Sequence, residues 1–261
     1  MREIKPLNVD NFGHQHWLAF ENFEFARRDM AAPLLASEFS TAAMALPIGF
    51  IRDKEQYVAI ALQGLMSGQN LFVDSAGDWR GKYIPAAYRA YPFCSLDGPD
   101  GQMFMGVDAQ SGLLTEPPDG QPFFTASGEP TGKIREISDF LATLAASRKD
   151  TTRLLSLIDS LGLFKPWELK IELSDGERKL EGLFCIDEEK LNQLPQDALS
   201  LLHQQSALPF IYCQLLSMQN VQILGQLLVQ RSGEAGQAAN DIRELNLDQI
   251  DQTSTINFDN F

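Results

Sequence analysis

Aromatic and basic residues gather between Asn70 and Phe93, in a stretch that reads NLFVDSAGDWRGKYIPAAYRAYPF. Pro85 and Pro92 exclude a long helix there. Aromatic rings offer a large contact area, tyrosine adds a polar hydroxyl group, and a guanidinium group stacks on ring faces. We therefore predict a groove that holds a peptide, a sugar or a partner protein, with five binding residues: Trp79, Tyr83, Tyr88, Arg89 and Tyr91.

The same stretch also has a purely structural interpretation. Aromatic side chains pack well in any protein core, so these rings could simply stabilise the fold. In that case, the substitution Arg89→Ala would change stability without changing any binding.

Three residues outside the stretch are candidates for acid/base chemistry: Asp108, Glu116 and His203. Two carboxylates near a tyrosine-rich groove suggest sugar hydrolysis, which depends on the distance between them. His203 follows an apolar stripe and has no nucleophile pattern beside it. An enzyme of unrecognised type is therefore the alternative to a binding protein. The sequence contains no glycine-rich phosphate loop and no nucleophile elbow.

The sequence gives little support for a metal site. His14 and His16 would share one face of a strand, but no cysteine or third histidine lies nearby. We expect no metal and no cofactor.

The hydrophobic pattern predicts the elements that must position the candidate residues. Apolar positions alternate with polar ones in two expected hairpins, and recur at three- and four-residue steps in the expected helices. The result is an α+β fold of antiparallel hairpins with a long central helix and C-terminal helices. The expected elements are hairpins over 48–62 and 167–186, a helix from Thr131 that closes at Gly162, and helices after Asp187, after Pro195 and from Pro209.

Composition limits the partners. The chain has 261 residues, 44% of them hydrophobic, and a formal net charge of -14, which disfavours nucleic acid because phosphate binding needs clustered Lys and Arg. The least polar run, 30–51, is interrupted by polar residues and prolines, so we expect no membrane span. The N-terminus, MREIKPLNVDNFG, has no continuous apolar run of the length that a signal peptide needs, so we expect no signal peptide. The three cysteines (Cys94, Cys185 and Cys213) are widely spaced. Reduced thiols in a cytoplasmic protein are therefore expected.

The chain is predicted to form one α+β domain over 1–231, followed by an acidic polar tail over 232–261. The tail is rich in Gly, Gln, Asn and Asp, which favours a flexible or loosely docked segment. Its scattered apolar residues would suffice to bind a groove on the same or another chain, and an oligomer is compatible with the sequence.

Several segments resemble the bacterial SapC-like family. They are SEF at 37–39, LPIGF at 46–50, QNLFVD at 69–74, GDWRGKYIPAAYRAYPF at 77–93, SGLLTE at 111–116, GLFKPWEL at 162–169, GLFCIDEEKLNQLP at 182–195 and LPFIYCQLLSMQN at 208–220. The resemblance runs in order over about 36–228. Ala90 replaces the second arginine of the family pattern.

The resemblance implies a link to bacterial surface-layer or outer-membrane systems, because the family is named after a protein encoded beside surface-layer secretion genes. It implies no catalytic residues. A permease label that is common in the family does not suit a chain without apolar spans of about 20 residues. We therefore expect a non-enzymatic cytoplasmic binding or accessory protein.

Overall fold

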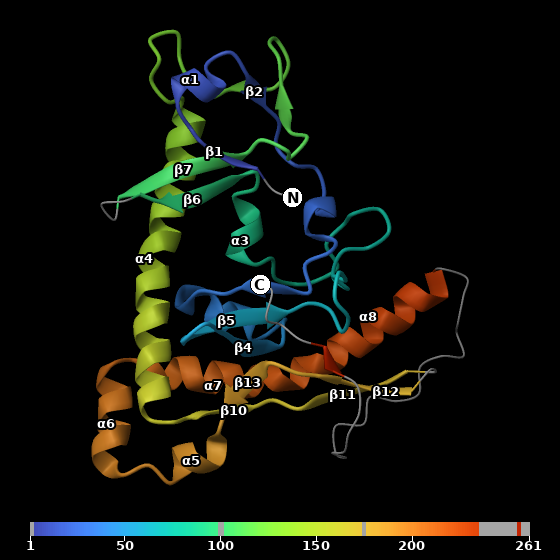
Figure 1. The fold of residues 1–261 in the computed structure, drawn as a ribbon, viewed down its shortest axis with the longest axis vertical. Coiled ribbons are helices and arrows are strands. Elements are labelled where there is room, and N and C mark those ends of the chain that lie inside the picture. Colours follow the sequence, from blue (N-terminus) through green and yellow to red (C-terminus); the bar gives the residue numbers. More distant parts are fainter. Residues whose placement is uncertain (1–2, 99–101, 174–175, 235–254, 257–261) are drawn as a thin grey trace.

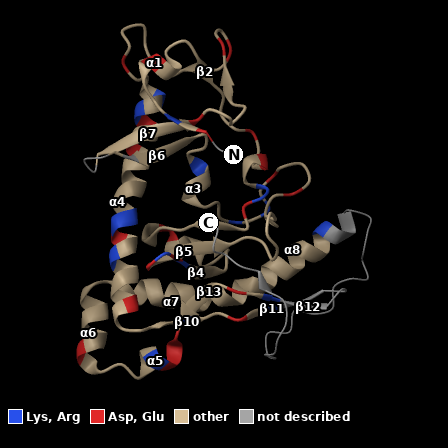
Figure 2. Cartoon of the chain, viewed as in Figure 1, with Lys and Arg blue, Asp and Glu red and all other residues tan. Residues whose placement is uncertain are grey.

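The computed structural model describes residues 3–98, 102–173, 176–234 and 255–256. One long helix, α4 (Gly132–Ser160), runs along the molecule and joins an upper to a lower group of elements (Figure 1). Basic and acidic residues both occur along this helix (Figure 2). The N-cap of α4 is Thr131, and its last turn is followed by Gly162, whose φ of 64° suits a glycine.

The lower group is built on an antiparallel sheet with the strand order β10-β13-β4-β5-β3. Helix α7 packs on β4 and β13, and α4 contacts β5. The sheet consists of β3 (Ala31–Pro33), β4 (Ile48–Asp53), β5 (Gln56–Leu62), β10 (Phe164–Pro166) and β13 (Leu183–Ile186). The helices around it are η2 (Ala36–Glu38), α2 (Phe39–Ala42), α3 (Ala86–Arg89), α5 (Glu188–Asn192), α6 (Gln196–Gln204), α7 (Ala207–Ser217), η3 (Met218–Asn220) and α8 (Val221–Glu234).

The upper group contains two small antiparallel sheets, with the orders β1-β7-β6 and β8-β2-β9. The first consists of β1 (Ile4–Pro6), β6 (Phe93–Asp97) and β7 (Met103–Asp108), and the second of β2 (His16–Trp17), β8 (Leu114–Thr115) and β9 (Gln121–Pro122). Helix α1 (Val9–Phe12) and the 3-10 helix η1 (Glu24–Ala26) flank them.

Two hydrophobic cores lie along α4. Its first half contributes Ile134 and Leu141 to the upper core, and its second half contributes Leu154 and Ile158 to the lower core. A third, smaller cluster contains Tyr88 and packs against Phe23, Phe25, Trp79 and Ile84. Rings of the aromatic stretch therefore pack together with rings of the N-terminal segment in this cluster.

A buried glutamine completes the lower sheet where β4 and β13 separate. These strands pair at Phe50–Phe184 and at Ile51–Leu183. Beyond that point Gln214, on α7, accepts a hydrogen bond from the backbone N–H of Ile186 (3.0 Å) and donates one to the carbonyl oxygen of Ile48 (3.1 Å). The Gln214 side chain thus supplies hydrogen bonds to backbone groups of β13 and β4 where the two strands do not pair with each other.

The structure confirms the predicted α+β class. It also confirms the hairpin over 48–62, the helix from Thr131 and the cap at Asp187, which accepts a hydrogen bond from the backbone N–H of Lys190. The second predicted hairpin is wrong in its last part. Strand β11 (Leu169–Leu173) pairs with β12 (Gly176–Leu180), whereas β13 pairs with β4 and β10. Gly182, with a φ of 79°, lies just before β13, whose residues Leu183, Cys185 and Ile186 are buried in the lower core.

The turn predicted at Ser174 and Asp175 lies outside the described residues, as does most of the predicted tail. Of that tail, residues 232–234 end α8, and β14 (Thr255–Ile256) pairs in parallel with Lys179 and Leu180 of β12. The division into a domain over 1–231 and a tail stays a prediction.

All three cysteines are free thiols. Burial raises the pKa of Cys185 to about 11 and also raises the pKa of Cys213. Because the thiolate is the reactive form, both groups are poor nucleophiles near neutral pH.

Candidate functional site

Two of the five predicted binding residues pack against neighbouring side chains: Tyr88 is buried and Trp79 is partly buried. Tyr88 is only 4% exposed, and its hydroxyl group donates a hydrogen bond to Oε1 of the buried Gln63 (2.7 Å). Trp79 stacks on Phe72 with ring centroids 5.4 Å apart, and its Nε1 donates to the carbonyl oxygen of Tyr83 (3.0 Å). These hydrogen bonds and ring contacts of Tyr88 and Trp79 are packing interactions within the protein.

Two others, Tyr83 and Arg89, belong to a network centred on Glu38, which is 5% exposed. Oε1 of Glu38 accepts hydrogen bonds from the Tyr83 hydroxyl group (2.8 Å) and the Ala86 N–H (2.7 Å), and Oε2 accepts one from the Leu35 N–H (3.0 Å). Nη2 of Arg89 donates to the Tyr83 hydroxyl oxygen (2.6 Å) and lies 3.7 Å from Oε1 of Glu38. One buried carboxylate thus ties the start of η2 to the start of α3.

This network predicts a loss of stability at high pH. Burial raises the pKa of Tyr83, and its hydrogen bond to Glu38 raises it further. A group whose pKa is higher in the folded state contributes its full stability below its unfolded pKa, about 10 for tyrosine, and loses it as the pH rises further. We expect the free energy of unfolding to fall above about pH 10, and to fall less steeply in the variant Tyr83→Phe. Urea titrations of both proteins between pH 7 and pH 11 measure this difference, and parallel curves would contradict it.

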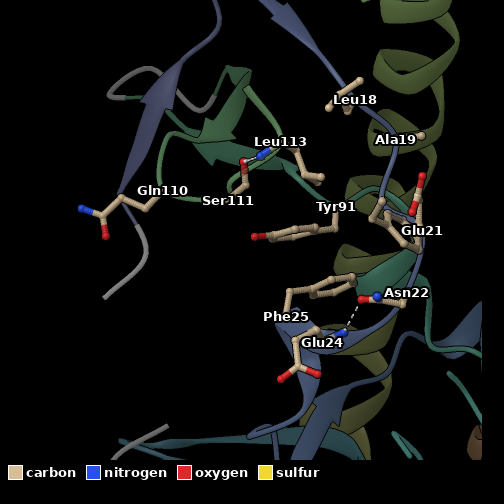
Figure 3. A pocket seen from close by; sticks show the side chains of 11 residues that line it. Leu18, Ala19, Glu21, Asn22, Glu24, Phe25, Tyr91, Gln110, Ser111 and Leu113 are labelled. Atoms are coloured by element: carbon tan, nitrogen blue, oxygen red, sulfur yellow. Dashed lines mark hydrogen bonds between the residues drawn. The ribbon is translucent and has the colours of Figure 1, made fainter. Parts of the chain in front are cut away.

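Tyr91, the fifth predicted residue, lines a cavity of about 870 Å³ (Figure 3). The volume lies within the range of about 300–1,000 Å³ that is typical of small-molecule sites. Three segments form the walls: the connection between β2 and η1 together with η1 itself, Tyr91 in the connection between α3 and β6, and the turn after β7. The lining residues are Leu18, Ala19, Phe20, Glu21, Asn22, Glu24, Phe25, Tyr91, Gln110, Ser111 and Leu113.

Aromatic rings make one wall of this cavity. Tyr91 stacks on Phe25 with centroids 3.9 Å apart and an interplanar angle of 9°, and Phe20 meets Phe25 edge-on at 5.2 Å. Figure 3 shows the Tyr91 ring between Phe25 on one side and Ser111 and Leu113 on the other. The stacked pair gives the cavity a flat apolar surface of the kind that holds another planar or apolar group.

Polar groups line the cavity beside the rings. Oδ1 of Asn22 accepts a hydrogen bond from the Glu24 N–H (3.1 Å), and Oγ of Ser111 accepts one from the Leu113 N–H (3.2 Å). Neither bond uses the amide donors of Asn22 or the hydroxyl donor of Ser111. Both residues therefore carry hydrogen-bonding groups suited to orienting a ligand.

Asp108 shapes the cavity wall. The carboxylate is buried, and its Oδ1 accepts hydrogen bonds from the N–H groups of Glu3 (3.3 Å) and Gln110 (3.0 Å). The Asp108 carbonyl oxygen also accepts a bond from the Ser111 N–H (3.1 Å). These bonds fix the turn that presents Gln110 and Ser111, so Asp108 acts as a positioning residue.

The other two acid/base candidates are exposed, and the structure does not assemble the three into one site. Glu116 follows β8, and His203 lies on α6, at the opposite end of the molecule from β7 and Asp108 (Figure 1). Any catalytic role of these residues stays a prediction.

Sequence reasoning missed most of the residues that form the cavity and the network. Phe20 and Phe25 belong to an aromatic-rich first segment, and that density was a usable signal. Glu38 lies in the SEF tripeptide, but nothing in its spacing indicated that it would meet Tyr83. Ser111 lies in the SGLLTE segment, but nothing there indicated a cavity, and Asn22 carried no signal beyond its polarity.

Neither a metal cluster nor a membrane span appears in the described part of the chain. No three His, Cys, Asp or Glu side chains lie close enough there to hold a metal ion, and Nδ1 of His16 lies 2.8 Å from the carbonyl oxygen of Asp119. Within the same residues, no helix has both the length and the apolar character to cross a bilayer.

Comparison with protein families matches the chain to the SapC family over residues 7–224. The chain belongs to the SapC family. No curated protein and no solved structure matches it significantly. The SapC match includes both Glu38 and the aromatic stretch, so the network and the Tyr91 wall of the cavity both lie within the family region.

Proposed function

We propose that this SapC-family protein is a non-enzymatic binding or accessory protein that holds part of a peptide, a sugar or a partner protein in the cavity beside Tyr91. The observation that carries the proposal is the stacked pair of Tyr91 and Phe25 in a cavity of about 870 Å³. Stacked rings supply contact area, and Asn22 and Ser111 supply hydrogen bonds that orient a ligand.

In our proposal, the other four predicted binding residues hold the cavity wall in place and do not contact the ligand in the cavity. They are Trp79, Tyr83, Tyr88 and Arg89. Tyr88 lies edge-on to Phe25 at a centroid distance of 5.8 Å, and Tyr88 in turn packs edge-on against Trp79 at 5.9 Å. The Tyr91 N–H donates to the carbonyl oxygen of Tyr88 (3.2 Å). The aromatic stretch therefore contributes one contact residue and a rigid base for it. Arg89, with 44% of its side chain exposed, remains available to a larger partner at the edge of the network.

The cellular setting is part of the proposal. Free thiols persist in a reducing compartment, which supports a cytoplasmic protein. Membership of the SapC family supports an accessory role in a bacterial surface-layer or outer-membrane system.

The test is a calorimetric screen of the full chain. The compounds are mono- and disaccharides, and a set of capped dipeptides in which each amino-acid side chain is represented. We expect at least one compound to bind, and the variant Tyr91→Ala to weaken its binding by about two- to tenfold, because an aromatic contact contributes about 0.5–1.5 kcal/mol. Ala19→Trp, which places a ring in the cavity, should abolish binding. The matched control Ala142→Trp, at an exposed position of α4, should leave it unchanged. Failure of every compound, or equal binding by all variants, would overturn the proposal.

A further inference from the structure

The charges around the cavity restrict its ligand. The lining residues include two carboxylates, Glu21 and Glu24, and no lysine or arginine. The formal net charge of the whole chain is -14. An anionic ligand would therefore meet repulsion from the wall and from the protein as a whole, whereas a cation would be attracted.

The two carboxylates differ in whether another side chain already pairs with them. Nε of Arg27 donates to Oε1 of Glu24 (2.6 Å), and this hydrogen bond lowers the pKa of Glu24. Within the described part of the chain, no ion pair or hydrogen bond engages the carboxylate of Glu21. Glu24 is thus already partnered by Arg27, and Glu21 is the carboxylate that a bound cation would approach.

The aromatic wall favours the same charge. A guanidinium or ammonium group is attracted to the negative face of an aromatic ring, and a guanidinium group also stacks flat on it. The rings of Tyr91, Phe25 and Phe20 line the same cavity as Glu21. The apolar side chains of Leu18 and Leu113 line the same space and would pack against a methylene stem.

We propose that the group held in this cavity is a cation on an apolar stem: an alkylammonium or guanidinium group with the shape of a lysine or arginine side chain. The inference rests on the proposed binding function and narrows its ligand. The stem lies between Leu18 and Leu113, the cation meets the aromatic wall, and Glu21 supplies the opposite charge. The same chemistry is offered by a peptide side chain and by a free amine.

The test is calorimetry of the full chain with matched probes at pH 7. N-acetyl-arginine-N-methylamide and N-acetyl-lysine-N-methylamide represent a peptide, and agmatine represents a free amine. N-acetyl-citrulline-N-methylamide has nearly the shape of the arginine probe without its charge. We expect at least one cationic probe to bind at least about fivefold more tightly than the citrulline probe. Binding should weaken as salt rises from 0.05 to 0.5 M. A preference for the capped residues over agmatine would identify a peptide as the source.

Glu21→Gln separates charge from shape. We expect it to weaken the cationic probes by about threefold or more and to leave the citrulline probe unchanged. The control Glu129→Gln, at an exposed position away from the cavity lining, should change neither.

The two proposals fail in different ways. Equal binding of the arginine and citrulline probes, or a neutral sugar that binds with dependence on Tyr91 but not on Glu21, would overturn the cation inference and leave the binding function standing. If no probe and no compound of the wider screen binds, both proposals fall.

Discussion

Replacement of Glu38 by alanine is expected to lower the free energy of unfolding by at least about 3 kcal/mol, because three donors lose their acceptor at a cost of about 1–3 kcal/mol each. These donors are the Leu35 N–H, the Ala86 N–H and the Tyr83 hydroxyl group. Burial of a carboxylate is itself costly, and a well-packed apolar replacement can offset the loss of an ion pair. Alanine is too small to do so, and it leaves two backbone groups unpaired.

Urea unfolding followed by circular dichroism measures this loss, with the midpoint and the slope reported separately. Glu38→Gln should have a smaller effect, because its amide keeps one acceptor oxygen but points a donor at one of the former partners. The control Glu129→Ala changes an exposed side chain and should alter stability by less than about 0.5 kcal/mol. A Glu38→Ala protein within 1 kcal/mol of the wild type, on the order of a single hydrogen bond, would show that the network contributes little.

Replacement of Gln214 by leucine is the second large effect that we expect. Leucine has a similar size but can neither accept from the Ile186 N–H nor donate to the Ile48 carbonyl oxygen. Both backbone groups would then be buried without partners, at about 1–3 kcal/mol each, so the expected loss is at least about 2 kcal/mol. Thermal and urea unfolding measure it.

Gln219→Leu provides the matched control, because Gln219 is exposed on η3 just beyond the same helix. It should leave stability nearly unchanged. Amide exchange gives a local readout: the Ile186 N–H should lose protection in Gln214→Leu before the rest of the sheet does. If that N–H stays as protected as in the wild type, the hydrogen bond to the Gln214 side chain does not stabilise this part of the sheet.

Local patterns were enough to predict most elements of the fold. The hairpin over 48–62 follows from two alternating runs around a polar turn, and the boundaries of α4 follow from Thr131 and Gly162. Strand β13 could not be assigned in the same way. Its apolar run fits equally well as part of the second arm of a hairpin with β11 or as a central strand, and only the partner β4, more than 130 residues earlier, decides between them.

The candidate site shows the same limit. The aromatic stretch was recognisable from composition, but the roles within it depend on distant partners. Tyr88 turns inward because Gln63 accepts a hydrogen bond from its hydroxyl group, and Tyr91 reaches the cavity because Phe25 stacks on it. No motif or spacing in the sequence indicates that Gln63 would contact Tyr88 or that Phe25 would contact Tyr91. Spacing along one segment therefore located the region of the site but could not separate its contact residue from its support.

NMR titration of the isotopically labelled full chain with the tightest-binding compound of the screen shows whether the cavity beside Tyr91 binds a ligand. We expect saturable shifts in residues 18–25, in the Tyr91 ring and in 110–113, and no such shifts in Ala19→Trp. Shifts confined to another surface, or a response that Ala19→Trp leaves intact, would contradict binding at this cavity.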